Sequence, residues 1–218
     1  MRIVVTGADG FIGQNLRVRL RELGHADVRC IIRATTAEHL REAVQGADFV
    51  YHLAGINRPT DPAEFATGNT GFTETLCAAL ADANCAAPVA FASSIQADLD
   101  NAYGRSKRAA EDTLLRHGRE CRAPVHLFRL VNVFGKWCRP NYNSAVATFC
   151  HNIARGLPIT VNNPAAALRL VYVDDVVSAF ADLLARPDAE GGFKDADPVY
   201  ETTVGEIGRA SCRERVWR

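Results

Sequence analysis

The chain has 218 residues, of which 48% are hydrophobic and 23% charged, a balance that is ordinary for a globular protein with a sizeable core. Its formal net charge is zero, so no charge excess points to nucleic acid or to an anionic membrane surface as a partner. No stretch approaches the length of an apolar membrane span, and a strand-like segment, RIVVTGADG, occupies the N-terminus where a signal peptide would lie. We therefore expect a cytoplasmic protein without a membrane partner.

Apolar runs and helical patterns alternate along the first 136 residues. The run at residues 2–7 ends in glycine, and Leu16, Leu20 and Leu23 then share one face of a helical segment. Such alternation predicts repeated βαβ units, and hence an α/β fold of the Rossmann type: a doubly wound parallel sheet with helices on both faces. Strands are predicted at residues 2–7, 27–33, 47–55, 88–94 and 124–135, and helices at 11–24, 36–46, 69–85 and 103–120.

After residue 136 the alternation loosens. A loop is predicted at residues 136–144, a helix at 145–156, and the end of a strand running into a helix at 170–187. The seven cysteines form no CxxC pair, so we expect structural thiols rather than disulfides or a metal site.

Three glycines follow the first predicted strand in the segment TGADGFIG. Gly7, Gly10 and Gly13 permit a tight turn and a close backbone approach to a pyrophosphate, and the helix that opens at Phe11 and Ile12 directs backbone amides at it. The spacing is GxxGxxG rather than GxGxxG, but the strand–turn–helix context is the required one. We therefore predict dinucleotide binding by these five residues.

The end of the second predicted strand, CIIRATT, should select the cofactor. An acidic residue there would hydrogen-bond the adenosine ribose, whereas an arginine accommodates a 2′-phosphate. Arg33 occupies this place, and it favours NADP(H) over NAD(H) unless it is simply a surface residue.

A second chemical motif is YGRSK. Tyr103 and Lys107 are four residues apart on a predicted helix and so share a face. A phenol exchanges protons near neutral pH when its pKa is lowered, and we expect the lysine and an oxidised nicotinamide to lower it. The preceding strand ends in ASS, which places Ser93 and Ser94 at the carboxyl edge of the sheet, where ligands bind in this architecture.

Taken together, these motifs resemble those of a known superfamily. VTGADGFIG, ADFVYHLAG, GNTGFTETL, the serine pair before YGRSK, RLVNVFG and YVDDV occur in the order typical of extended short-chain dehydrogenases/reductases, the NAD-dependent epimerase/dehydratase family that modifies sugar nucleotides. The resemblance implies that Tyr103 is the catalytic acid/base, Lys107 its partner, Ser94 the hydroxyl that binds the reacting carbonyl, and Asn69 the residue that supports the lysine through water. It also implies cofactor contacts at Leu53, Ala54 and Gly55, and a nucleotide-sugar contact at Asn132.

Longer segments resemble a narrower group, the capsular-polysaccharide reductases of the CapF/WbjC type. They are HLAGINRP, SSIQADLDNAYGRSK and VFGKWCRPNYNSAVATFCHNIARGLPI. This resemblance implies an NADPH-dependent reductase domain, followed in the full-length homodimer by a zinc-containing cupin domain with epimerase activity, on the route to N-acetyl-L-fucosamine.

The same resemblance implies sugar-nucleotide contacts in the loop after residue 135. Lysine and arginine suit a pyrophosphate, and tyrosine can stack on uracil or sugar. Where relatives often carry an arginine before YVDDV this chain has Leu168, so Arg169 beside it becomes the candidate. The predicted substrate contacts are Asn132, Lys136, Arg139, Asn141, Tyr142 and Arg169.

The function implied is NADPH-dependent reduction of a UDP-4-keto-6-deoxy-N-acetylhexosamine in capsular or O-antigen biosynthesis. Two alternatives stay open: an NAD-dependent nucleotide-sugar epimerase or dehydratase, and a non-catalytic dinucleotide-binding sensor on the same fold. A sensor is expected to lack the tyrosine–lysine pair, which is present here. A dehydratase is expected to carry an acid pair next to the catalytic serine, and Asp98 and Asp100 do not follow Ser94 directly.

The last residues, EIGRASCRERVWR, fit the preceding pattern poorly, because they are rich in arginine and show no apolar stripe. They back-translate into a common sequencing-library adapter, so we interpret residues 207–218 as an artefact. We accordingly predict an NADP(H)-binding core at 1–136, a partial substrate-binding region at 137–206 and no cupin domain. Such a chain is expected to expose apolar surface and to be marginally soluble.

Overall fold

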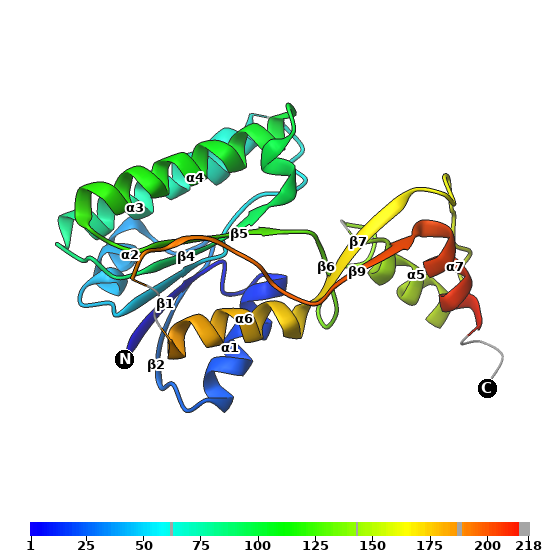
Figure 1. Ribbon diagram of the computed structural model, residues 1–218, viewed down its shortest axis with the longest axis horizontal. Coiled ribbons are helices and arrows are strands. Elements are labelled where there is room, and N and C mark those ends of the chain that lie inside the picture. Colours follow the sequence, from blue (N-terminus) through cyan, green and yellow to red (C-terminus); the bar gives the residue numbers. More distant parts are fainter. Residues whose placement is uncertain (62, 143, 187–188, 214–218) are drawn as a thin grey trace.

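Six parallel strands form the central sheet of the protein (Figure 1). The computed structural model describes residues 1–61, 63–142, 144–186 and 189–213. The strand order is β2-β1-β3-β4-β5-β8, so the chain winds outward from β1 first in one direction and then in the other, as predicted for a doubly wound sheet. The strands are β1 (Arg2–Thr6), β2 (Asp27–Ile31), β3 (Phe49–His52), β4 (Val89–Ser94), β5 (Val125–Leu130) and β8 (Gly192–Lys194).

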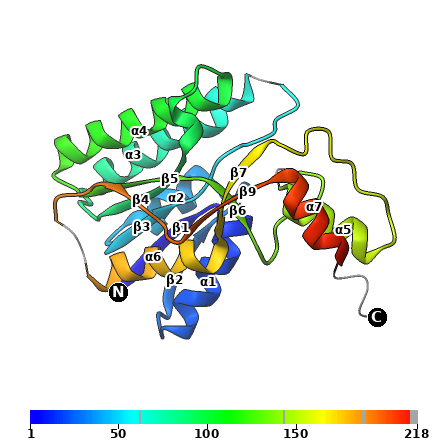
Figure 2. The ribbon, with the colours of Figure 1, turned by 45° about the vertical axis from the view of Figure 1, so that its right-hand side comes forward.

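Helices cover both faces of this sheet (Figures 1 and 2). One face carries α2 (Ala37–Val44), α3 (Phe72–Asp82) and α4 (Ala102–Cys121), and the other carries α1 (Phe11–Glu22) and α6 (Val173–Ala185). Successive strand residues point to opposite faces, so the central strands are apolar on both sides and form two separate cores. No helix among the described residues is long and apolar enough to cross a lipid bilayer.

A smaller sheet lies beside the core at the right of Figure 1. It consists of β6 (Asn132–Phe134), β7 (Ala167–Tyr172) and β9 (Val199–Thr203), with α5 (Ala145–Ala154) and α7 (Val204–Arg213) packed together next to it.

The single strand predicted at residues 124–135 is wrong. The segment divides at Val131, because β5 pairs with β4 in the large sheet whereas β6 pairs with β7 in the small one. An apolar run does not record that the chain changes sheets within it. The later elements α6 and β8 return to the large core, where β8 extends the sheet and α6 packs beside α1. The face that carries α2, α3 and α4 is built from residues before 136. The domain division itself stays a prediction.

The C-terminal segment begins as an ordered helix. α7 continues through residues 207–213, and a Cβ at Gly208 would lie 3.3 Å from the Val161 side chain and 3.7 Å from that of Phe149. This part of the tail therefore packs against α5 and the segment that follows it, while its origin as an adapter artefact stays a prediction. The remaining tail, residues 214–218, lies outside the described residues.

The packing of Phe180, on α6, leads to a prediction about stability. Phe180 is fully buried, meets the Phe128 ring edge-on at 4.8 Å between centroids, and lies 5.6 Å from the Tyr51 ring. Phe180→Ala should lower the free energy of unfolding by about 3–5 kcal/mol, because it leaves a cavity. Urea unfolding measures this, with Leu99→Ala as the control, since that side chain is 54% exposed. Equal losses in the two variants would contradict the packing described.

Candidate active site

The turn between β1 and α1 is built so tightly that only glycine fits it. Gly7 has a φ of +65°, and a Cβ there would lie 2.7 Å from the backbone nitrogen of Ala54. A Cβ at Gly13 would lie 2.2 Å from the Gly7 carbonyl oxygen. Gly10 is the N-cap of α1 and has no side chain that could bond to the first backbone amides of the helix. These amides, from Phe11 onward, therefore face the carboxyl edge of the sheet without a capping group. These residues fit the pyrophosphate of a dinucleotide.

Arg33 lies two residues beyond the end of β2 and points away from the core. Its side chain is 87% exposed, and its guanidinium group is 3.9 Å from the carboxylate of Glu64. The end of β3 is held against β1, because Leu53 donates its backbone N–H to the Thr6 carbonyl at 3.2 Å and Ala54 donates to the Thr6 hydroxyl at 3.1 Å. The predicted cofactor residues thus border the same edge as the glycine turn.

Asn69 lies in a π-helical turn, η1 (Ala66–Gly71), that precedes α3. The helix predicted from residue 69 therefore begins earlier and with wider geometry, a feature that recurs at functional sites. The buried Asn69 side chain accepts from the Ile56 N–H at 2.7 Å and donates to the Ile56 carbonyl at 3.1 Å. It also donates to the Ser106 hydroxyl at 2.9 Å, which in turn donates to the Tyr103 carbonyl at 2.8 Å. Asn69 thus joins the loop after β3 to the first turn of α4.

Lys107 is buried beneath this loop. Its ammonium group donates to the Ala92 carbonyl at 2.9 Å and lies 4.6 Å from the centroid of the Phe91 ring. A Cβ at Gly55 would lie 3.2 Å from the ammonium nitrogen and 3.0 Å from the Asn69 Oδ1. Gly55 therefore packs directly against both polar groups, and a larger residue would displace them.

The local backbone brings Ser94 and Tyr103 together. Ser94 ends β4 and caps η2 (Ile95–Asp98), and α4 starts after Asn101, whose side chain accepts from the Gly104 N–H at 2.8 Å. A Cβ at Gly104 would lie 2.3 Å from the carbonyl of Gln96, so η2 and the first turn of α4 touch through their backbones. This contact sets Tyr103 beside the Ser94 hydroxyl, with which the phenol interacts.

The lowering of the Tyr103 pKa by Lys107 and an oxidised nicotinamide stays a prediction, and burial acts against it. Burial raises the pKa of Tyr103, and the interaction with Ser94 opposes that rise while nearby Tyr142 adds to it. Burial is the largest of these effects. The phenol consequently keeps its proton at neutral pH, which suits a proton donor.

Sequence reasoning did not find the partners of the neighbouring serine. The Ser93 side chain lies on the opposite face of β4 from that of Ser94, and its hydroxyl donates to the Glu111 carboxylate at 2.5 Å. The buried Glu111 is held by Arg129 through two hydrogen bonds, of 2.9 Å and 2.6 Å. Strand alternation signals that adjacent serines diverge, but it does not tell which one faces the tyrosine.

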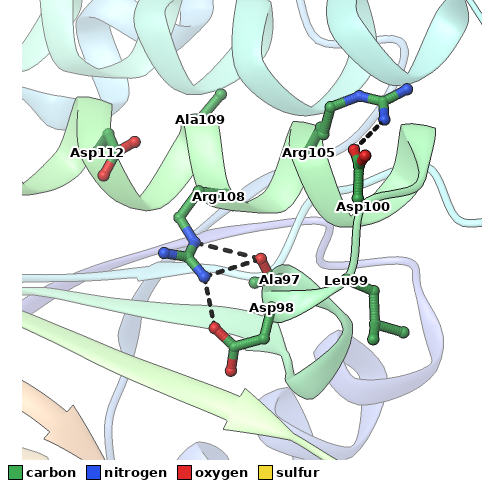
Figure 3. Close-up of a pocket in the computed structure, with 8 residues that line it drawn as sticks. All are labelled: Ala97, Asp98, Leu99, Asp100, Arg105, Arg108, Ala109 and Asp112. Atoms are coloured by element: carbon green, nitrogen blue, oxygen red, sulfur yellow. Dashed lines mark hydrogen bonds and ion pairs between the residues drawn. The ribbon is translucent and has the colours of Figure 1, made fainter.

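A hollow beside η2 contains paired charges (Figure 3). Arg108 donates to the Ala97 carbonyl and to Asp98, and Arg105 pairs with Asp100. The two aspartates weighed above for dehydratase chemistry are therefore engaged by α4 arginines. These bonds fasten η2 to α4 and so support the placement of Ser94.

The predicted substrate contacts are dispersed. Tyr142 lies close enough to Tyr103 to raise the pKa of that phenol. The side chains of Lys136 and Arg169 form ion pairs, at 2.9 Å with Asp174 and 3.8 Å with Glu201. Of the others, Asn132 donates to the Arg169 carbonyl at 3.2 Å, Arg139 is exposed, and Asn141 has a φ of +55° and donates its N–H to Thr148 at 2.9 Å.

A doubly wound sheet, a glycine turn at its switch point and a Ser–Tyr–Lys set at its carboxyl edge define a dinucleotide-binding protein of the extended short-chain dehydrogenase/reductase type. The profile of the NAD dependent epimerase/dehydratase family matches residues 3–196, and the chain belongs to that family.

Known proteins are similar over most of the chain. The UDP-2-acetamido-2,6-beta-L-arabino-hexul-4-ose reductase of Pseudomonas aeruginosa is 48% identical over 207 residues, which cover 95% of this chain and 56% of the relative. The crystal structure of the capsular polysaccharide assembling protein CapF from Staphylococcus aureus matches with a TM-score of 0.87 and 39% identity, over 98% of this chain and 58% of that one. The chain thus spans little more than half the length of these relatives.

A more distant structure agrees in fold. The UDP-glucose 4-epimerase of Thermus thermophilus in complex with NAD has a TM-score of 0.85 at 22% identity, covering 98% of this chain and 83% of the epimerase.

The buried lysine predicts a pH dependence of stability. Burial lowers the pKa of Lys107 to about 8, against 10.5 for an ordinary lysine, while Glu111 acts in the opposite direction. Between these two values the unfolded chain binds more protons than the native state, so stability rises with pH there. From pH 7 to pH 10 the protein should gain roughly 2–3 kcal/mol relative to Lys107→Met. Urea unfolding of both proteins at the two pH values measures the difference, and identical pH dependence would contradict it.

Proposed function

We propose that this chain carries the reductase centre of a sugar-nucleotide enzyme, reducing the C4 carbonyl of a UDP-4-keto-6-deoxy-N-acetylhexosamine with NADPH. The observation that carries the proposal is the placement of Ser94 and Tyr103 beside buried Lys107 at the edge of the dinucleotide-binding sheet. The relative that is 48% identical is named as a reductase of a UDP-linked 4-ulose, and this supports the substrate class. Use in capsular or O-antigen synthesis, on the route to N-acetyl-L-fucosamine, is part of the same proposal.

The residues divide the work of the reduction. Bound NADPH supplies the hydride that the C4 carbon accepts. Tyr103 donates its phenolic proton to the carbonyl oxygen, which becomes the 4-hydroxyl, and Ser94 donates a hydrogen bond that orients that oxygen. Lys107 stabilises the phenolate that forms on Tyr103 and offers its ammonium to the cofactor ribose at Gly55.

The state of Tyr103 favours this direction of chemistry. A tyrosine phenol is in its acid form at neutral pH, and burial raises the pKa of Tyr103 further. Reduction of a ketone begins with the acid form, whereas an epimerase first needs a base to take a proton from a sugar hydroxyl. Net consumption of NADPH separates the two reactions.

Tyr103→Phe tests the proton donor. The rate of NADPH oxidation with a UDP-4-keto-6-deoxy sugar should fall by about 100-fold or more, because the phenylalanine cannot protonate the oxygen. Absorbance of NADPH measures the rate, and Tyr200→Phe on β9 is the matched control, since Tyr200 is exposed. Undiminished turnover by Tyr103→Phe would remove this residue from the mechanism. Product formed without loss of NADPH would favour the epimerase alternative.

Arg33→Ala tests the choice of cofactor. The value of kcat/KM for NADPH should fall roughly tenfold or more, because a charged hydrogen bond to the 2′-phosphate is lost, while the value for NADH stays the same. The control is Arg29→Ala, which removes an arginine of β2 that pairs instead with Asp27. If both cofactors lose equally, Arg33 does not read the 2′-phosphate.

A further inference from the structure

His52 lies behind the proposed catalytic centre, in the last position of β3, and has no exposed surface. Its Nδ1 is 2.8 Å from the hydroxyl of Thr6 at the end of β1. Its Nε2 is 2.8 Å from the hydroxyl of Thr73 in the first turn of α3. The imidazole therefore bridges the strand that leads into the glycine turn and the helix that follows Asn69.

The direction of each hydrogen bond follows from the other bonds of the two threonines. The Thr73 hydroxyl donates its single proton to the Asn69 carbonyl at 2.8 Å, so it must accept from His52 Nε2. The Thr6 hydroxyl accepts from the Ala54 N–H at 3.1 Å, which leaves its own proton for His52 Nδ1. All donors and acceptors are satisfied when the ring is neutral and carries its proton on Nε2.

The neighbouring charge requires the same neutral state. The Phe91 ring stacks on His52 at 5.0 Å between centroids, and the ammonium of Lys107 lies 4.6 Å from the centroid of that ring. The other ring near His52 is Phe72, at 5.7 Å, which carries no charge. Burial, together with the positive charge of Lys107, lowers the pKa of His52 to about 3. The interior thus holds one cation at this place, and it is the lysine.

We propose that His52 is a positioning residue, a neutral imidazole whose two hydrogen bonds hold the cofactor-binding end of β3 in register with the turn that carries Asn69. Ala54 reaches the ring through Thr6, and the Asn69 carbonyl reaches it through Thr73. The Asn69 side chain in turn hydrogen-bonds the backbone N–H and carbonyl of Ile56, two residues beyond Ala54, so the network returns to the segment after β3. The part that His52 plays in turnover rests on the proposed function, whereas its part in cofactor binding does not.

Thr73→Val tests the proposal with little change of volume. The variant leaves the Nε2 proton of His52 without an acceptor and removes the anchor of Asn69. Thr75→Val is the matched control, because the Thr75 hydroxyl makes the same kind of bond, to the Gly71 carbonyl at 2.9 Å, on the exposed side of α3. Thr73→Ser restores the hydroxyl and is the rescue.

Three measurements on the 218-residue chain are decisive. Spectra of ¹⁵N-histidine-labelled protein should show His52 as the neutral Nε2–H tautomer from pH 5 to 9. NADPH affinity, followed by nucleotide fluorescence, should fall about tenfold in Thr73→Val, the equivalent of one lost hydrogen bond, and remain unchanged in Thr75→Val. With a 4-keto sugar, kcat should fall similarly while KM for the sugar stays constant, and Thr73→Ser should recover both values.

Several outcomes would overturn the inference. A His52 ring that is protonated on Nδ1, or that titrates between pH 6 and 8, refutes the neutral bridge. Equal NADPH affinity in Thr73→Val and Thr75→Val refutes the positioning role. If the unsubstituted chain binds NADPH but reduces no 4-keto sugar, the proposed function fails, and the spectra and affinities still decide the role of His52.

Discussion

The buried ammonium group of Lys107 is the constraint to which the rest of the site responds. A charge removed from water needs compensation, which the Ala92 carbonyl, the face of Phe91 and the field of Glu111 supply. Glu111 is itself buried and depends on the two hydrogen bonds from Arg129. The charge of Lys107 thus connects the ion pair that joins α4 to β5 with the neutral state of the histidine on the far side of Phe91.

The parallel sheet makes such a site easy to assemble. β1, β3 and β4 all end at one edge, so the glycine turn, the segment up to Gly55 and Ser94 meet there although they lie far apart in the chain. Helices α3 and α4 pack on one face of the sheet and begin near this edge. The backbone contact at Gly104 brings the start of α4 against η2, and the π-helical turn with Asn69 precedes α3.

Local motifs could be predicted, and their surroundings could not. The glycine turn needs only neighbouring residues, and Tyr103 and Lys107 share a face by helical periodicity alone. The division of the strand at Val131 escaped prediction, because both halves are apolar and differ only in the sheet they join. Lys136 stays a predicted substrate contact, and its ammonium pairs with Asp174, 38 positions away, which no local pattern records.

The sequence by itself determined the alternation of strands and helices, the turn that suits a pyrophosphate and the helical face that Tyr103 and Lys107 share. These features follow from periodicity and from the conformational freedom of glycine, which act over a few residues. Only the tertiary structure decided that burial raises the Tyr103 pKa, that Ser94 rather than Ser93 faces this phenol, and that His52 is a neutral bridge. Those properties arise from burial and from partners on other elements, and burial exists only once the chain has folded.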